Sequence, residues 1–570
     1  MFKPTREANL RSKFLSSYGH NTKFYTILKQ YKEDWGNTLF ILDEELAKHY
    51  WLFSKHHLFI GEKELSVRLH ELEVTLVDEN YINFRFNTCL NLETVVGKEK
   101  TLLHLQQNSP VGLQKSTNRN ASVIAVGGHI TSMQWLPKDY SKNNNDNSSY
   151  LAIAVINKDG GLAALQPTSK ELSVFSNLHA QKLESAIQIW KYNASLDEIT
   201  LEKILVTSNF GAVTDIQWAP LYTDGNVIGV LAGVFKDGTV RILKISHTLP
   251  KFSRINTPSL SFYSNDPLLP ANNNYVSRIT CFAFHGSNKL LAGTADGFIL
   301  EFELPFLTQH DNNGNNNNNN DDDDDISNSS PNYKTFVSPG PISSIVSIRT
   351  SAAATSTTPA AANTTTDRNS MILINGQASR GVAFLDANPI QDIYAPLHEK
   401  SNIKPTYNYL LQDVLVTTQN LESAKTLSLR SLQDTASETL RLSAYITACK
   451  LSEVLGHPFM LTGTNAGDIV IMNYSRKFLS SRGKGKASSP LKIWKFQADN
   501  TNDDTLTLIG DYEKLEVESP VPASYMPKEV MISSVAWNEN VIGASVYAAG
   551  TASGVLLIER LDPSKQSRKI

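Results

Sequence analysis

One stretch of the chain, residues 211–245, holds a complete three-stranded unit and constrains the fold most. Residues 213–218 alternate apolar and polar side chains and stop at Pro220, as a half-buried strand does. Residues 227–234 form a continuous apolar run, which suits a strand covered on both faces. Asp237-Gly238 then supplies the left-handed backbone of a two-residue hairpin loop, and a third strand follows. Because one such unit cannot bury both faces alone, it predicts copies elsewhere in the chain.

The copies are present at irregular spacing. Residues 128–137 repeat the opening of the unit, and its first strand recurs at 278–285 and 532–538. The turn recurs at 291–297, 461–467 and 548–554, each time with a Gly-Thr-x-x-Gly core between apolar runs. Such repetition is typical of a β-propeller with long insertions. We therefore expect an all-β fold, a seven-bladed β-propeller of degenerate WD-repeat type.

The blades can be placed along the chain. We expect them at residues 130–190, 211–245, 279–302, 342–385, 411–429, 443–496 and 532–560, the fifth being the weakest in pattern. Residues 122–126 form a short strand that has no hairpin partner upstream. We predict that this strand pairs with residues 555–558 of the last blade and closes the ring, which removes a free sheet edge.

The remaining segments differ in composition. Residues 1–120 are an N-terminal extension, expected to be partly disordered, with strand patterns at 72–77 and 81–86 that indicate a degenerate blade or a decoration. The propeller itself is expected at 121–562, followed by a basic tail at 563–570. Asn and Asp dominate residues 311–332, and Ser, Ala and Thr dominate 351–367. Both segments lack the apolar area that offsets chain ordering and are predicted to be disordered loops.

Composition limits the compartment and the partners. Three widely spaced cysteines favour a reducing environment, without a disulfide framework or a cysteine metal cluster. The longest apolar run is too short to cross a bilayer and the N-terminus has no apolar signal core, so we expect a soluble intracellular protein without membrane contact. The net charge is −3, and the Asp-rich segment leaves the remainder mildly basic. Bulk charge therefore argues neither for nor against nucleic acid.

Motifs for catalysis are missing from the sequence. It contains no Gly-x-Ser-x-Gly elbow, Walker loop, His-Glu-x-x-His or Cys-x-x-Cys pair. His56 and His57 are neighbours and would point to opposite faces of a strand, whereas His129 and His285 suit structural hydrogen bonds better than metal ligation. We expect no enzyme activity, no catalytic residue, no cofactor and no metal. The equivalent tryptophans of the repeat, Trp135, Trp218 and Trp537, favour core packing over a binding cage.

Two basic segments are candidates for contact with DNA. One is a loop that carries five cations and no acid: Arg476, Lys477, Arg482, Lys484 and Lys486. Its Arg-Gly-Lys-Gly-Lys core has the form of a short minor-groove hook, in which glycines let the flanking cations approach phosphates. The other is the N-terminus, with Arg11 and Lys13. The alternatives are a solvated surface insertion for the loop and a flexible terminus for the N-terminal segment.

The order of motifs from Ile189-Trp190 through residues 211–220 and 237–242 to 461–468 resembles the propeller subunits of transcription factor IIIC. The resemblance covers about residues 120–560, although the Trp-Asp dipeptide of WD repeats is missing throughout. It implies a nonenzymatic nuclear scaffold that pairs with a second propeller subunit and with a large DNA-binding subunit. DNA would then be part of the complex, and the complex would serve transcription by RNA polymerase III. The resemblance implies no small-molecule substrate. The alternatives are a scaffold in another nuclear assembly and a propeller hydrolase.

Overall fold

The structure is a computed structural model, and the statements below concern the residues that it describes. These are 58–86, 90–138, 148–157, 184–264, 277–285, 288–307, 328–349, 370–375, 380–385, 388–393, 404–408, 414–419, 422–428, 437–452, 459–473, 490–498, 505–515, 526–540, 543 and 545–561.

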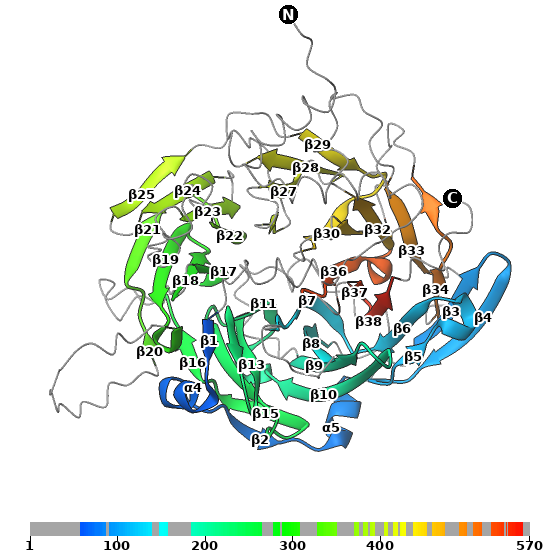
Figure 1. Ribbon diagram of the computed structural model, residues 1–570, viewed down its shortest axis with the longest axis horizontal. Coiled ribbons are helices and arrows are strands. Elements are labelled where there is room, and N and C mark those ends of the chain that lie inside the picture. Colours follow the sequence, from blue (N-terminus) through cyan, green and yellow to red (C-terminus); the bar gives the residue numbers. More distant parts are fainter. Residues whose placement is uncertain are drawn as a thin grey trace, which may run out of the picture.

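Seven sheets of four or more strands stand around a common axis in this part of the chain, like the blades of a propeller (Figure 1). Blade 1 contains β7 (His129–Trp135), β8 (Ser148–Ile156), β9 (Ser185–Asn193) and β10 (Glu198–Val206). Blade 2 contains β11 (Val213–Trp218), β13 (Val227–Phe235), β14 (Val240–Ser246), β16 (Leu260–Phe262) and β20 (Asn328–Ser329). Blade 3 contains β17 (Ile279–His285), β18 (Lys289–Thr294), β19 (Phe298–Glu303) and β21 (Tyr333–Phe336). Blade 4 contains β22 (Ser344–Arg349), β23 (Ser370–Asn375), β24 (Arg380–Leu385) and β25 (Asn388–Ile393).

The other three blades complete the circle. Blade 5 contains β26 (Thr406–Asn408), β27 (Val414–Gln419), β28 (Ser423–Ser428) and β29 (Ser437–Arg441). Blade 6 contains β30 (Ile446–Leu451), β31 (Phe459–Thr464), β32 (Asp468–Asn473), β33 (Leu491–Ala498), β34 (Thr505–Ile509) and the short β35 (Glu513–Lys514). Blade 7 contains β36 (Ile532–Trp537), β37 (Val546–Thr551) and β38 (Val555–Arg560), completed by β6 (Asn120–Ala125) and β5 (Val111–Gly112). Three short 3₁₀ turns, η2 (Ser208–Phe210), η3 (Pro305–Leu307) and η7 (Lys528–Val530), lie between strands. The predicted all-β, seven-bladed propeller is confirmed.

The ring is closed by a strand from the N-terminal part of the chain. Strand β6 pairs antiparallel with β38, so that Ala125 lies opposite Val555 and Ser122 lies opposite Ile558. This is the pairing that the sequence predicts. This pairing covers the edge of β38 and joins the two ends of the propeller sequence in one sheet.

A repeated bulge joins successive blades. In blades 1, 2, 3, 6 and 7 the pairing of the innermost strand shifts at a Thr or Ser that follows an isoleucine or valine near the start of the strand. In blades 1, 3, 6 and 7 the hydroxyl of this residue donates to a backbone carbonyl at the start of the next blade, for example from Thr131 Oγ1 to Val213 O (2.7 Å) and from Ser533 Oγ to Ile130 O (2.6 Å). A bulge re-aims the side chain that it carries. In these four blades the Thr or Ser is therefore a link to the next blade, whereas Thr214 of blade 2 donates to Val234 O of its own blade (3.4 Å).

Glycines allow the close approaches that the repeat requires. Gly238, Gly297, Gly467 and Gly554 have φ between +82° and +88°, the conformation predicted for the hairpin turns. A different glycine, Gly293 on β18, faces the next blade, where a Cβ atom would lie 2.7 Å from Ile342 Cγ2. The two glycines of the Gly-Thr-x-x-Gly core thus have separate tasks, the first in packing between blades and the second in the turn.

Within its described residues, 58–86 and 90–120, the N-terminal extension decorates the outside of the ring and adds strands to other sheets without forming a blade of its own (Figure 1). Strand β1 (Leu58–Ile60) pairs with β12 (Leu221–Thr223), and β2 (Glu73–Leu76) pairs with β15 (Phe252–Thr257), which itself joins the outer edge of blade 1. Strands β3 (Leu90–Val96) and β4 (Glu99–Leu105) extend blade 6. Helix α4 (Glu62–Arg68) connects β1 to β2 and α5 (Glu79–Arg85) connects β2 to β3, whereas α6 (Gln114–Thr117) lies between β5 and β6. The extension therefore contacts blades 2, 1, 6 and 7 in turn.

The strand predicted at residues 81–86 is wrong, because this segment forms helix α5. Asp78 caps the helix by accepting a hydrogen bond from the backbone N–H of Asn80 (3.0 Å). Ile82 and Phe86, four residues apart, are both fully buried on one side, while Phe84 is exposed. The segment YINFRF fits a helix period as well as an alternating one, and the cap decides between them.

Other predictions concern the core and the loops. Trp135, Trp218 and Trp537 are buried, which confirms their role in core packing. Within the segment predicted to be disordered, Asn328–Ser329 forms β20 and pairs with β16. The rest of the predicted Asn/Asp loop up to residue 327, the loop at 351–367 and the tail at 563–570 lie outside the described residues. No helix in the described ranges has the length and apolar character to cross a bilayer.

Candidate interaction surfaces

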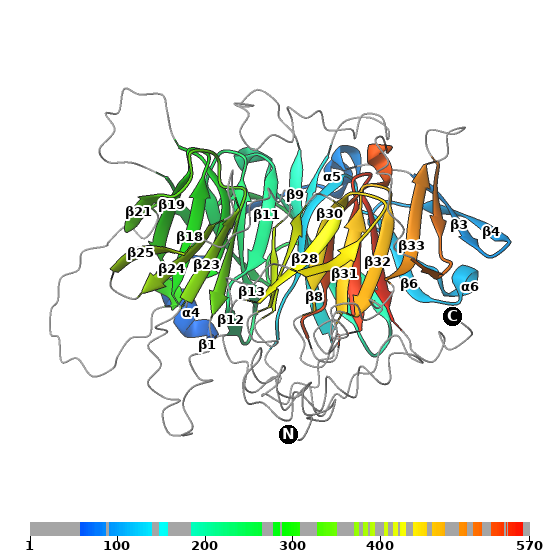
Figure 2. The same cartoon turned by 90° about the horizontal axis from the view of Figure 1, so that it is seen from above.

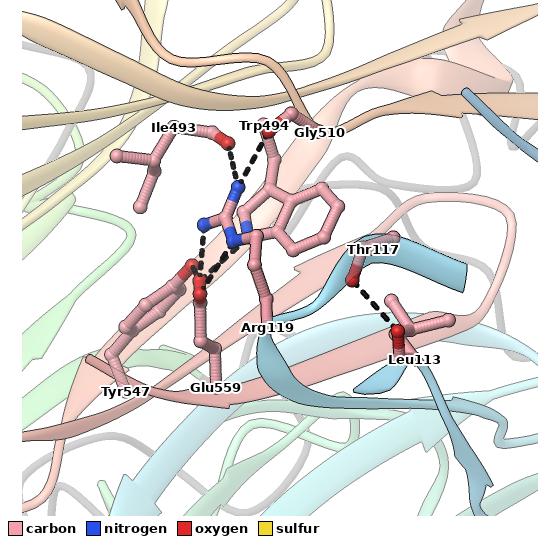
Figure 3. Close-up of polar contacts among 8 residues, drawn as sticks. All are labelled: Leu113, Thr117, Arg119, Ile493, Trp494, Gly510, Tyr547 and Glu559. Atoms are coloured by element: carbon pink, nitrogen blue, oxygen red, sulfur yellow. Dashed lines mark hydrogen bonds and ion pairs between the residues drawn. The ribbon is translucent and has the colours of Figure 1, made fainter. Parts of the chain in front are cut away.

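A buried ion pair fixes the closing strand between blades 6 and 7 (Figure 3). Arg119, directly before β6, donates from Nε and Nη2 to the two carboxylate oxygens of Glu559 at 2.7 and 2.6 Å. The third nitrogen, Nη1, donates to Ile493 O (2.6 Å) and Gly510 O (3.0 Å). The guanidinium carbon of Arg119 lies 3.7 Å from the ring centroid of Trp494, and Trp494 Nε1 donates to Glu559 (2.6 Å). Tyr547 donates to the same carboxylate oxygen.

The contacts of this network indicate a structural role. Arg119 and Glu559 are 7% and 2% exposed, and the guanidinium and the carboxylate are already bonded by the protein. Burial and the neighbouring Glu559 carboxylate raise the pKa of Tyr547 well above its usual value, so the phenol remains a donor. A saturated buried pair offers no open position to a ligand, and it serves to hold the first and last parts of the chain together.

A central channel lies where the innermost strands of the blades meet. It has a volume of about 570 Å³ and is lined by the innermost strands of the blades, which contribute mostly small polar side chains, among them Ser132, Gln134, Thr280, Ser344 and Thr447. Cys281 and Cys449 also line it, and burial raises the pKa of each thiol to about 12. Neither thiol is therefore a reactive nucleophile near neutral pH.

Charged side chains in the channel are paired with each other. Lys404, just before β26 of blade 5, binds Asp215 Oδ2 on β11 of blade 2 at 2.8 Å, which connects two distant sides of the ring. Ser132 Oγ donates to the other oxygen of Asp215 (3.0 Å). Glu539 lies 3.8 Å from Lys450 Nζ. Each of these two carboxylates therefore has a cationic or hydroxyl partner, and the ion pairs connect different blades across the channel.

The side chains of His129 and His285, the two histidines expected to form structural hydrogen bonds, do so within the ring. His129 Nδ1 donates to Ala552 O (3.3 Å), and burial lowers the pKa of its imidazole to about 4. His285 Nδ1 forms a 2.9 Å hydrogen bond with Ser347 Oγ of the next blade. His56 and His57 lie outside the described residues. No group of three or more His, Cys, Asp or Glu side chains in the described ranges is placed to hold a metal ion.

The candidate DNA contacts Arg476, Lys477, Arg482, Lys484 and Lys486, as well as Arg11 and Lys13, lie outside the described residues. The flanks of the loop are described: it leaves β32 after Asn473 and returns at Leu491 of β33, so it belongs to blade 6. Two neighbouring lysines are partly neutralised there, since Lys492 pairs with Glu513 and Lys495 lies opposite Asp468. Trp494, beside them in sequence, is buried and belongs to the Arg119 network.

Most of the large apolar side chains that are exposed belong to the N-terminal extension, where they are spread over β1, α4, β2, α5 and β4. The large apolar residues that are exposed in the described ranges are Phe59, Val67, Leu76, Phe84, Leu102, Leu196 and Phe336, and the first five belong to the extension. Sequence reasoning missed these side chains, because isolated apolar residues in a weakly patterned segment give no sign of their exposure.

Comparison with known proteins gives two relatives. The chain is 24% identical over 581 residues to the transcription factor tau 91 kDa subunit of Saccharomyces cerevisiae, covering 97% of this chain and 76% of the relative. It is 22% identical over 459 residues to the transcription factor tau subunit sfc6 of Schizosaccharomyces pombe, covering 79% of this chain and 66% of the relative. No protein-family model matches the chain. The matches span the propeller and confirm the resemblance seen in the sequence motifs: the chain is homologous to these transcription factor tau subunits.

Proposed function

We propose that the chain is a nonenzymatic scaffold subunit of a nuclear transcription factor IIIC assembly that serves RNA polymerase III. The observation that carries this proposal is homology over 97% of the chain to a transcription factor tau subunit. The ring supports it, because a rigid propeller presents broad faces and a decorated rim, which suit protein docking. In the described residues the charged groups of the channel are bonded within the ring, as a scaffold requires.

The main partner is a second propeller subunit of the same assembly, with the large DNA-binding subunit as the other. The exposed apolar side chains of the N-terminal extension favour this task, since apolar groups on a rim contribute to interfaces that exclude water. A specific interface of this kind buries on the order of 1,600 Å² in total. Binding to the partner, and not to a small molecule, is then the principal activity of the chain.

DNA is contacted through the assembly, with the Arg476–Lys486 loop as the local contribution of this chain. The loop leaves blade 6 between β32 and β33 and carries five cations without an acid. Phosphate contacts by such a loop would be independent of DNA sequence and sensitive to salt. Arg11 and Lys13 would add a second, weaker contact.

Affinity purification of the tagged full chain from nuclear extract, with identification of the bound proteins, tests the proposal. We expect a second propeller protein and a large DNA-binding subunit in near-stoichiometric amounts, and enrichment of the tagged chain at genes that RNA polymerase III transcribes. Recovery with the subunits of a different nuclear assembly, without enrichment at such genes, would refute the assignment.

A further inference from the structure

Blade 5 is attached to the ring through a short innermost strand. Strand β26 has 3 residues, whereas the innermost strands of the other six blades have 6 or 7. It pairs with β27 over these residues, from Thr406 opposite Val416 to Asn408 opposite Val414. Toward blade 6, Thr406 Oγ1 accepts a hydrogen bond from the backbone N–H of Leu451 (3.1 Å). Because a short strand brings few main-chain bonds, side-chain contacts matter more for the attachment of this blade.

A lysine beside this strand reaches across the centre of the ring. Blade 5 lies opposite blade 2 in Figure 1, and Figure 2, which views the ring from its edge, shows the blades standing in one layer. The Nζ atom of Lys404 lies 2.8 Å from Asp215 Oδ2 of blade 2 and 6.0 Å from the ring centroid of Phe282 in blade 3. One side chain next to blade 5 therefore contacts two blades that are not its neighbours in the ring.

Both ends of this ion pair are held in position. Ser132 Oγ of blade 1 donates to Asp215 Oδ1 (3.0 Å) and accepts a hydrogen bond from the backbone N–H of Ile216 (3.3 Å), which orients the carboxylate. Pro405 follows Lys404 and restricts the backbone of the lysine to extended conformations. Such preorganisation lowers the entropy that is lost when the pair forms.

The strength of the pair suits the control of a local opening. The side chains of Lys404 and Asp215 are 40% and 26% exposed, so water and salt partly screen their attraction. Loss of such a pair changes an equilibrium by about fivefold, which equals about 1 kcal/mol at 1.4 kcal/mol per tenfold. This change is minor for unfolding of the whole ring. It is large for a local opening, because the free energies of local openings begin near zero.

We propose that the Lys404–Asp215 ion pair is a salt-sensitive clasp that holds blade 5 against blades 2 and 3 across the channel. When the clasp breaks, the sheet of blade 5 opens locally, while the other blades and the Arg119–Glu559 junction stay closed. The inference does not depend on the proposed function, because it concerns the movement of one blade within the ring.

Hydrogen exchange of the full chain tests the clasp, with the peptide covering β27 (residues 414–419) as the readout. Lys404→Met keeps most of the side chain and removes its charge. We expect β27 to exchange about fivefold faster in this variant, and β37 of blade 7 to exchange as in the wild type. The control is Lys289→Met, which breaks an ion pair of similar exposure, 2.7 Å from Glu301, that lies within blade 3. This control should leave the exchange of β27 unchanged.

A double variant and a salt titration separate the clasp from a general loss of stability. Asp215→Asn should speed the exchange of β27 as much as Lys404→Met does, and the double variant should go no further, because both changes break one contact. Raising NaCl from about 0.05 M to about 0.5 M should speed the exchange of wild-type β27 about two- to threefold, with little change in Lys404→Met.

Several results would overturn the inference. These are wild-type exchange of β27 in Lys404→Met, additive effects in the double variant, faster exchange in all blades, and a salt response that persists in Lys404→Met. Exchange of wild-type β27 that does not change with salt would also overturn it, and that measurement needs no variant.

Discussion

Replacing Glu559 by Gln should open the junction that closes the ring. Four donors converge on the Glu559 carboxylate: Arg119 Nε and Nη2, Trp494 Nε1 and the Tyr547 hydroxyl. Glutamine has the same shape but one acceptor oxygen, and its amide N–H₂ would face donors. The charge of Arg119 would remain buried without its counter-ion. Removal of one partner from a buried pair costs about 3–5 kcal/mol.

The matched control is the adjacent residue. Arg560 pairs with Asp197 at 3.2 Å, but their side chains are 35% and 41% exposed, so Arg560→Ala should cost about 1 kcal/mol or less. With an unfolding entropy of about 2.1 cal/mol/K per residue, a chain of this size loses about 1 °C in Tm per kcal/mol. Thermal unfolding followed by circular dichroism should therefore show a loss of about 3–5 °C for Glu559→Gln. A loss no larger than that of Arg560→Ala would refute the idea that this pair locks the ring.

Three further outcomes are expected. Gly293→Ala should lower the free energy of unfolding by about 1–3 kcal/mol, because the added Cβ would lie 2.7 Å from Ile342 Cγ2. The control Gly112→Ala has open space around it and should be nearly neutral. Equal losses of Tm in the two variants would contradict the idea that Gly293 is needed for packing between blades. Burial lowers the pKa of His129 to about 4, whereas the same imidazole in the unfolded chain has its ordinary pKa of about 6.5. Below about pH 6.5 the unfolded chain therefore binds one more proton than the folded chain. The free energy of unfolding should fall by roughly 3 kcal/mol as the pH drops from about 6.5 to about 4. His129→Gln should remove this part of the pH dependence, and an unchanged profile would contradict it. Replacing Arg482, Lys484 and Lys486 by Ala should flatten the salt dependence of DNA binding by the assembly, and an unchanged slope would assign the loop to solubility alone.

The blades could be predicted from sequence because their signals are local. A continuous apolar run such as residues 227–234, followed at once by Asp237-Gly238, specifies a hairpin within about 20 residues of chain. Even the pairing of residues 122–126 with the last blade followed from a local observation, the lack of a nearby partner, combined with the need to close a ring. The strand misassigned at 81–86 shows the limit, since a six-residue pattern fits two periods and only Asp78 decides.

The contacts that join distant segments had no such signal. Arg119 and Glu559 lie at opposite ends of the propeller sequence, and neither stands in a motif that names its partner. The parallel pairing of β3 with β34 likewise gives no turn or spacing to read. By contrast, the bulges at Thr131 and Ser533 could have been found, because a hydroxyl residue follows the opening isoleucine in both repeats and reaches the next blade.

The central claim, that this chain is a scaffold whose main task is to bind a second propeller subunit, is tested most directly by gel filtration of the two co-expressed proteins in high salt. A heterodimer held by an interface of about 1,600 Å² should stay intact there, while DNA binding by the single chain should vanish, because phosphate contacts weaken steeply with salt. A chain that runs as a monomer beside the second propeller subunit, yet binds promoter DNA alone at nanomolar concentration, would contradict the account.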